Sequence, residues 1–192
     1  GGGAAGAPPL FPDPVARAAG DLEGMAAADF DGDGVLDLAV AGHLALEDGA
    51  VSVFLGRGDG RFETEIRYPA GDATTAVAVA DFDLDGLPDL AVANTGSTQD
   101  SRGDVAVLLN LGAGRFAAPA RLTAGDRPWS IAAGDFDRDG RPDLVVANAG
   151  SDDISVFLGH GDGTFGSAVG HPTGSVSEWI AIADFDGDAR AD

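Results

Sequence analysis

Cysteine and lysine are both absent from this 192-residue chain, and aromatic residues make up only 7% of it. Without cysteine, no disulfide and no thiolate metal site can form. Nucleic-acid binding requires clustered Lys and Arg, and the only basic residues besides histidine are 11 scattered Arg. No apolar stretch approaches the roughly 18 residues of a membrane-spanning helix. We therefore expect neither a nucleic-acid partner nor a membrane span.

Acidic residues, by contrast, are abundant. The chain has 32 Asp and Glu and a formal net charge of −21. Hydrophobic residues nevertheless make up 44% of the sequence, which is enough to build a core and unlike a disordered acidic tail. The 30 glycines indicate many tight turns.

Half of the acidic residues belong to one nine-residue frame, Asp-x-Asp-x-Asp-x-x-x-Asp, which is written four times. The copies start 52, 54 and 49 residues apart, and each follows an apolar run. A single copy could be a solvated turn, but four copies in register indicate a repeat that holds a hard cation. Their acids are Asp29, Asp31, Asp33 and Asp37; Asp81, Asp83, Asp85 and Asp89; Asp135, Asp137, Asp139 and Asp143; Asp184, Asp186, Asp188 and Asp192.

Short β-type segments surround every frame. An apolar run such as 76–80 precedes it, a second such as 89–94 follows it, and a third such as 105–109 comes next. A more polar segment, as in 117–122, follows with the alternation expected of an outer strand. No segment shows a sustained helical period. Four antiparallel strands per unit of about 50 residues is the pattern of a β-propeller blade.

Loop and strands together resemble the FG-GAP, or VCBS, repeats of integrin α-chain propellers and of many bacterial secreted proteins. The motif is clearest in 79–94 and in Phe157-Leu158-Gly159-His160-Gly161-Asp162-Gly163-Thr164-Phe165. The resemblance implies an all-β fold of propeller-type, four-stranded antiparallel blades. We expect a flexible lead-in over 1–10 and repeat units at 11–61, 62–115, 116–164 and a partial unit at 165–192.

The frame geometry favours Ca²⁺ in each loop. Asp at positions 1, 3 and 5 supplies carboxylates, and Gly at position 6 permits the positive φ of a sharp turn. The backbone carbonyl of position 7 can then face the ion, and the resemblance implies that Asp at position 9 is the last ligand. An all-oxygen shell of six or seven ligands suits Ca²⁺ better than Mg²⁺. The position-7 residues are Val35, Leu87, Arg141 and Arg190.

The fourth frame departs from this pattern. Ala189 replaces glycine at position 6, and Asp192 is the last residue of the sequence, so we expect this loop to lack a following strand that anchors it. We expect Ca²⁺ in the first three loops and leave the fourth open.

Other conspicuous residues have simpler interpretations. Arg57-Gly58-Asp59 falls on a turn that recurs in the next units, and His43, His160 and His171 occupy unrelated repeat phases. Trp129 and Trp179 are expected to pack in the core or between blades, with a sugar-stacking platform as the alternative. The phenylalanines at loop position 2 are expected to pack between blades; they are Phe30, Phe82, Phe136 and Phe185.

No nucleophile motif or phosphate loop is present, and four similar loops argue against catalysis. We expect a non-enzymatic, calcium-stabilised protein that is secreted or displayed on a surface and acts in binding, adhesion or extracellular assembly. Two alternatives stay open: a lectin, and the non-catalytic propeller part of a larger extracellular enzyme.

Three full units do not close a ring, because propellers usually have about 4–8 blades. The sequence alone allows a fragment of a longer propeller, two chains that share one ring, or a head-to-tail filament. Self-association is therefore an expected partner interaction, beside a protein or glycan ligand.

Overall fold

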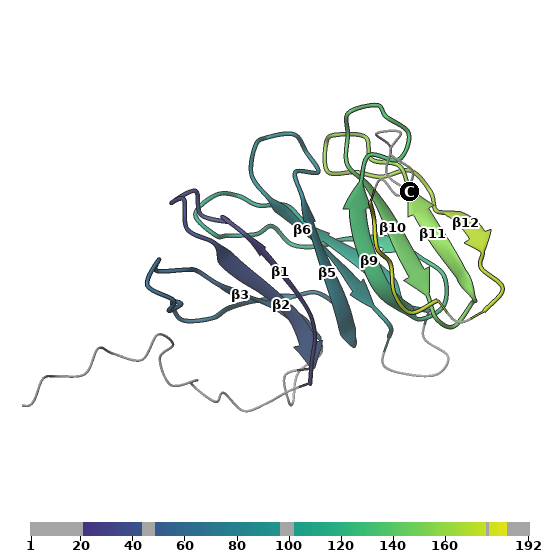
Figure 1. The fold of residues 1–192 in the computed structure, drawn as a ribbon, viewed down its shortest axis with the longest axis horizontal. Coiled ribbons are helices and arrows are strands. Elements are labelled where there is room, and N and C mark those ends of the chain that lie inside the picture. The colour runs from purple at the N-terminus through teal and green to yellow at the C-terminus, as the bar shows by residue number, and fades with distance from the viewer. Residues whose placement is uncertain (1–20, 44–48, 97–101, 176, 184–192) are drawn as a thin grey trace, which may run out of the picture.

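Every regular element in the computed structural model is a β-strand (Figure 1). The structure describes residues 21–43, 49–96, 102–175 and 177–183. Within them, twelve strands form three antiparallel four-stranded sheets, and there is no helix. The all-β fold of four-stranded antiparallel sheets is thus confirmed. The same residues contain no helix that could cross a membrane.

The three sheets follow one another along the chain without crossovers. The first sheet comprises β1 (Asp21–Ala28), β2 (Asp37–His43), β3 (Ala50–Phe54) and β4 (Ile66–Pro69). The second comprises β5 (Thr74–Ala80), β6 (Asp89–Asn94), β7 (Asp104–Leu108) and β8 (Ala120–Thr123). The third comprises β9 (Pro128–Gly134), β10 (Asp143–Asn148), β11 (Asp153–Phe157) and β12 (Val169–Pro172).

The burial of a strand, which depends on its place in the sheet, explains its amino-acid composition. Every residue of β6 and β10 is buried, which accounts for their apolar sequences on both faces. The last strand of each sheet is short and more exposed, and in β8 it carries the charged Arg121. Polar outer edges of this kind discourage pairing with other chains.

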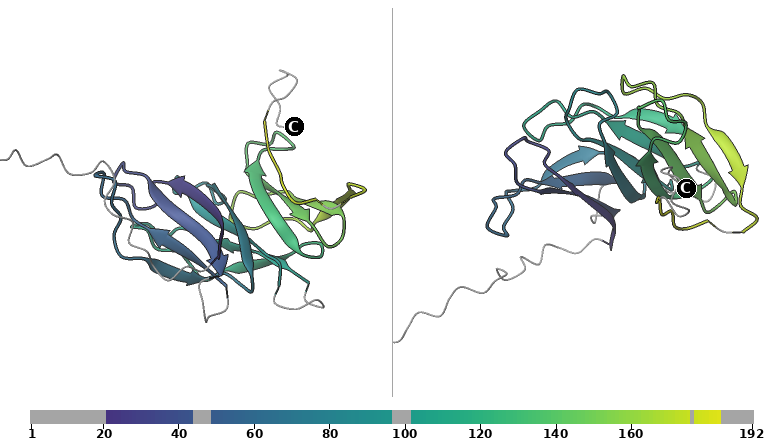
Figure 2. Two further views of the ribbon diagram at one scale, coloured as in Figure 1. Left: turned by 60° about the horizontal axis from the view of Figure 1, so that its bottom comes forward. Right: turned by 45° about the horizontal axis from the view of Figure 1, so that its top comes forward.

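Neighbouring sheets pack through two apolar layers. Strand β1 lies against β5, and β5 lies against β9, so the first strands of the three sheets are neighbours (Figure 2). In the middle sheet the alternation of β6 divides its side chains between the two layers. Leu90 and Val92 face the first sheet, whereas Ala91 and Ala93 face the third. Larger side chains on one face and small ones on the other let consecutive sheets interdigitate.

Sequence units and sheets are offset. In the sequence, the polar segment after Phe62 lies at the start of the second repeat unit. In the structure, this segment is β4, which pairs with β3 and so completes the first sheet. The same holds for β8 and β12. The expected lead-in 1–10, and the region 11–20 that follows it, lie outside the described residues.

Residues 177–183 differ from expectation. The apolar run from Trp179 to Ala183 precedes the fourth frame as a first strand should, but the structure gives it no strand. The sequence predicts that Trp179 packs in the core or between blades, yet it is 81% exposed. In the three sheets a first strand pairs only with the second strand. No such second strand is present here among the described residues, so nothing supports a ladder.

Candidate metal sites

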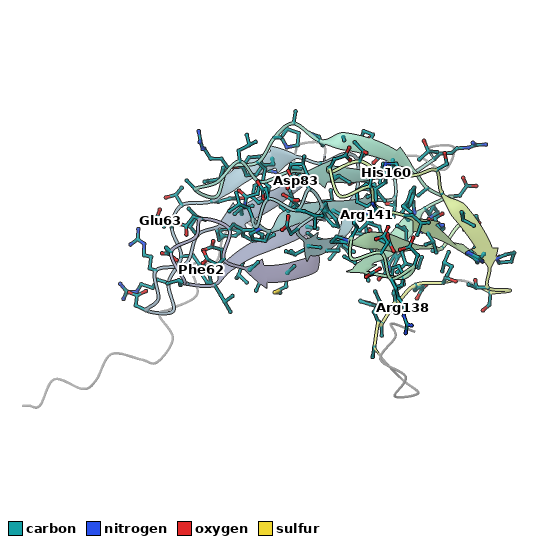
Figure 3. The ribbon with its side chains drawn as sticks, turned by 90° about the horizontal axis from the view of Figure 1, so that it is seen from above. Phe62, Glu63, Asp83, Arg138, Arg141 and His160 are labelled. Atoms are coloured by element: carbon teal, nitrogen blue, oxygen red, sulfur yellow. The ribbon has the colours of Figure 1, made fainter. Side chains whose placement is uncertain are left out.

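Each of the three acidic frames within the described residues lies in the loop that joins the first strand of a sheet to its second strand. The frames therefore begin directly after Ala28, Ala80 and Gly134 and end on the first residue of β2, β6 and β10. Figure 3 labels Asp83 in the second loop and Arg138 and Arg141 in the third. Because the three loops occupy the same place in three similar sheets, they can be compared residue by residue.

Two backbone positions in each loop have positive φ. At position 6, Gly34, Gly86 and Gly140 have φ of +84°, +89° and +82°, as the sequence predicts. Position 4 also has positive φ, which the sequence pattern did not predict. It is glycine only in the first loop, whereas Leu84 and Arg138 have φ of +60° and +67° in the other two. These conformations turn the loop inward on itself.

The inward turn gathers the carboxylates. In the first two loops the Asp at positions 1, 3 and 5 each offer one oxygen, and the three oxygens lie within 4.8 Å of one another. Backbone N–H groups hold the first carboxylate: Asp29 accepts from Gly32 at 2.8 Å and Gly34 at 2.8 Å. The loop is thus pre-shaped by the carboxylates' own hydrogen bonds.

The Asp at position 9 has a second task. Asp89 is fully buried, and its two carboxylate oxygens accept the N–H of Phe82 at 2.8 Å and of Asn110 at 2.7 Å. Asp37 and Asp143 make the equivalent pairs of bonds with the loop and with the turn after the third strand. This carboxylate fastens the acidic loop to the turn that follows the adjacent third strand. The sequence showed the residue but not this role, because its partner after the third strand lies 16 to 21 residues away.

The third loop varies the arrangement. Its cluster within 4.8 Å consists of Asp135, Asp137 and Asp143, while Asp139 pairs with the guanidinium of Arg141. The carbonyl ligands predicted at position 7 stay a prediction. The N–H groups of Val35, Leu87 and Arg141 donate to the position-5 carboxylates of their loops.

The electrostatics of these loops vary with the surroundings of each acid. Backbone N–H groups, chiefly that of Gly34, lower the pKa of Asp29. Burial raises the pKa of Asp31 and of Asp83, and the charge of Asp85 raises the latter further. Burial also raises the pKa of Asp89 to about 6. Ionised carboxylates are thus held close together at a cost that a bound cation would remove.

The donor set fits a hard divalent cation. Every clustered side-chain ligand is a carboxylate oxygen, and oxygen-only sites are typical of Ca²⁺ and Mg²⁺. Two unit charges ~4 Å apart repel by about 4 kcal/mol at an effective dielectric of ~20, so three such groups favour a counter-ion.

The remaining candidates do not converge on a second site among the described residues. The fourth frame, including Asp184 to Asp192 and Phe185, lies outside them. Arg57-Gly58-Asp59 forms an exposed turn with Gly58 at φ +72°, as its repeat phase predicts. His160 bonds to Thr164 in the equivalent turn of the third sheet. Asn94 and Asn148 are buried at the ends of β6 and β10 and hydrogen-bond to Asp104 and Asp153 of the neighbouring strand.

Known proteins are similar in sequence to parts of this chain. Mouse phosphatidylinositol-glycan-specific phospholipase D is 38% identical over 89 residues, which is 42% of this chain and 11% of the mouse protein. Chicken integrin alpha-V is 30% identical over 155 residues, 67% of this chain and 15% of the integrin. The chain therefore spans only about a tenth to a seventh of these relatives.

A solved structure supports the fold. The Photorhabdus luminescens Tc holotoxin pore matches with a TM-score of 0.50 over 87% of this chain and 8% of the toxin chain, at 23% identity. The FG-GAP-like repeat matches three times, over residues 29–92, 81–146 and 137–192. Each match begins within an acidic frame and includes the next one, so together they contain all four frames. The chain belongs to the FG-GAP-like repeat family.

Proposed function

We propose that this chain is a calcium-binding, non-catalytic module of an extracellular protein, which acts in binding or adhesion. The observation that carries the proposal is the threefold recurrence of a carboxylate cluster in one position of three successive sheets. The integrin relative, in which the alignment covers most of this chain, supports the adhesive role and the extracellular location.

Calcium acts in this proposal as a structural cross-link. Extracellular modules bind Ca²⁺ with dissociation constants of about 10⁻⁴ to 10⁻³ M. At ten times that concentration, each site stabilises the fold by ~1.4 kcal/mol. Three sites contribute roughly 4 kcal/mol, a large fraction of the ~5–15 kcal/mol of a typical domain. The contribution reaches the sheet through the position-9 Asp, whose bonds join the loop to the end of the third strand.

The test is a thermal melt of the protein in excess chelator, in calcium and in magnesium. We expect the chelator to lower the melting temperature sharply, and calcium to restore it better than magnesium. An unchanged melting temperature in excess chelator would overturn the proposal.

The non-catalytic assignment rests on repetition. The clusters of acids among the described residues are the same loop repeated, whereas a catalytic site needs a single set of groups with different roles. One relative is named as a phospholipase, but the matched region is 11% of that protein. Hydrolysis of phosphatidylinositol-glycan by the purified chain would contradict the assignment.

A lectin is the second candidate, and one observation favours it. Trp129 and Trp179 line the same cavity of about 410 Å³, beside the first strands of the three sheets. Glu23, Thr75 and Ser130 supply polar groups in its wall. An aromatic face with adjacent polar groups suits a sugar ring. A glycan array should then show binding that Trp179→Ala abolishes while the melting temperature is unchanged; an empty array excludes this candidate.

A further inference from the structure

The two interfaces between sheets repeat one set of contacts. Phe30 of the first metal loop meets Phe116 of the second sheet edge to face at 5.5 Å, and Phe82 meets Phe165 of the third sheet in the same way at 5.4 Å. These contacts confirm that two of the four loop phenylalanines, Phe30 and Phe82, pack between sheets. Each interface thus joins the loop of one sheet to the turn before the last strand of the next.

The backbone repeats the same register. The carbonyl of Phe30 accepts the N–H of Gly114 at 3.1 Å, and that of Phe82 accepts the N–H of Gly163 at 3.0 Å. A Cβ on Gly114 or Gly163 would lie only 2.7 Å from a Leu side chain of the preceding sheet, Leu55 or Leu109. Both interfaces therefore contain the same three contacts. These are a pair of Phe rings, a hydrogen bond from a Gly N–H to a Phe carbonyl, and a Leu side chain that covers the same Gly.

The first sheet carries the receiving half of this interface without a partner among the described residues. The turn bridges Gly56–Phe62, Asn110–Phe116 and Gly159–Phe165 make Phe62 the counterpart of Phe116 and Phe165. Phe62 is 41% exposed, whereas Phe116 is 7% exposed. Gly60, the counterpart of Gly114 and Gly163, is exposed, and a Cβ added to it would meet nothing within 4 Å. We call Gly60, Phe62 and the half-buried Leu38 and Val40 the leading face; Figure 3 shows Phe62 at one end of the molecule.

The third sheet carries the inserting half. Its loop phenylalanine, Phe136, is only half-buried, whereas Phe30 and Phe82 are at most 1% exposed. Leu158 stands in the position of Leu55 and Leu109 and is 40% exposed. Together with the half-buried Ile154 and Val156, these residues form the trailing face.

We propose that the trailing face of one copy of this chain docks on the leading face of a second copy. Phe136 then meets Phe62, the carbonyl of Phe136 accepts the N–H of Gly60, and Leu158 covers Gly60. The contact is heterologous, because the two faces differ, so it propagates from copy to copy unless the rotation closes a ring.

A second copy is the occupant that the observations favour. Both halves of one interface lie on this chain, in the register that the structure uses twice between its own sheets. In that register, β1 of the second copy lies along β9 of the first copy. In the single chain, Trp179 and Ile180 occupy this place and line the cavity beside β9. Residues 177–183 have no strand pairing that would hold them there. The net charge of −21 opposes association, so calcium in the loops should promote it.

The test begins with one variant for each face, measured by sedimentation velocity in calcium. Wild type should associate as its concentration rises through about 1–100 μM. Phe62→Ser disables the leading face and Leu158→Ser the trailing face, and each should weaken self-association about tenfold or more. Leu111→Ser is the matched control: Leu111 is 61% exposed on the middle sheet and belongs to neither face.

Mixing the two defective chains distinguishes this mode from any symmetric contact. Phe62→Ser keeps an intact trailing face, and Leu158→Ser keeps an intact leading face. An equimolar mixture should therefore form a 1:1 dimer that grows no further. A monomeric wild type, undiminished association of the single variants, or a mixture that stays monomeric would each overturn the proposal.

A gain-of-contact variant tests the register. Tyr68 of the first sheet donates its hydroxyl to the carbonyl of Gly114 and packs on Phe116 at 5.3 Å. Strand pairing makes exposed His171 its counterpart on the third sheet. His171→Tyr should tighten association about threefold or more, and the absence of any gain would count against this register.

Calcium titration of the same samples separates this proposal from the proposed function. If calcium binds but Phe62→Ser and Leu158→Ser associate like wild type, the docking proposal alone fails. If association depends on both faces but no calcium binds, the proposed function alone fails.

Discussion

In each of the three described acidic loops, the fourth and sixth residues have the least favourable backbone conformations. Both have positive φ, which costs a residue with a Cβ roughly 1–2 kcal/mol relative to its usual conformation. Leu84 and Arg138 nevertheless occupy position 4. The loop's hydrogen bonds to Asp81 and Asp135 hold this conformation in place.

Substitution of Gly86 isolates this conformational cost. A Cβ on Gly86 would meet nothing within 4 Å, so Gly86→Ala introduces no clash. We expect a loss of about 1–2 kcal/mol in the free energy of unfolding, from the φ of +89° alone. Urea unfolding in calcium measures it. Gly170→Ala is the control, because its φ is not positive and its nearest contact would be 3.7 Å. Equal stability of Gly86→Ala and wild type would contradict the argument.

Two acids of one loop should respond differently to calcium. Asp83 clusters with Asp81 and Asp85, and burial and their charges raise its pKa. Asp83→Asn should therefore stabilise the protein in chelator by removing repulsion. In calcium it should destabilise the protein by about 1 kcal/mol, through loss of a ligand.

Asp89 should behave differently because it accepts two buried backbone N–H groups. In Asp89→Asn, an amide NH₂ faces one of these donors and leaves it unpaired, at a cost of about 1–3 kcal/mol. The loss should be present both in calcium and in chelator. Urea unfolding in calcium and in chelator separates the two residues. If Asp89→Asn, like Asp83→Asn, stabilised the protein in chelator and destabilised it in calcium, Asp89 would be only a ligand.

At the scale of elements, stability depends on the contact between neighbouring sheets. Two Phe pairs have the same geometry at the two interfaces, although the partners in each pair come from different repeats of the sequence. The apolar layers around them contain mostly Ala, Val and Leu. Large rings inserted among small side chains therefore fix how one sheet sits on the next.

Phe82 and Phe136 form a matched pair at loop position 2. Phe82 is buried against Phe165, whereas Phe136 has no ring partner within the described part of the chain. Phe82→Ala should cost about 3–5 kcal/mol, the usual range for a buried Phe, and Phe136→Ala less than half as much. Urea unfolding at a protein concentration low enough to keep the chain monomeric measures both. Similar losses would show that Phe136 is covered as well as Phe82.

The sequence predicted the ends of a strand correctly where polar residues flank an apolar run. Asp89–Asn94 is β6 to the residue, because its two ends are a loop carboxylate and a capping Asn. The sequence predicts an outer strand at 117–122, but β8 begins at Ala120, because Phe116 forms an isolated bridge with Asn110 and the next three residues form no ladder. Neighbouring strands determine this detail, so no local pattern contains it.

At the scale of the whole molecule, the family, the all-β fold and the three acidic clusters followed from repetition. An acidic frame that occurs four times at nearly regular spacing indicates a structural repeat and not an isolated turn. The second role of Asp37, Asp89 and Asp143 did not follow, because it depends on the distance between strands. The exposed Trp179 did not follow either, because its burial requires strands that the described residues do not supply.

Charge is the other property of the whole molecule. Half of the 32 acidic residues behind the formal net charge of −21 belong to the four acidic frames, and three of these frames occupy the same position in the three described sheets. Self-repulsion of this kind destabilises a compact state. Divalent cations in the loops act on the largest concentration of charge, so metal binding and folding should be coupled throughout.

The most direct test of this account is the number of calcium ions bound per chain. Isothermal titration with calcium should find at least three sites. Asp31→Asn, Asp83→Asn and Asp137→Asn should each remove one, because each substitution disables one cluster. The magnesium titration should show weaker binding. Fewer than three calcium ions per wild-type chain, or a stoichiometry unchanged by all three substitutions, would contradict the claim that each described loop is a calcium site.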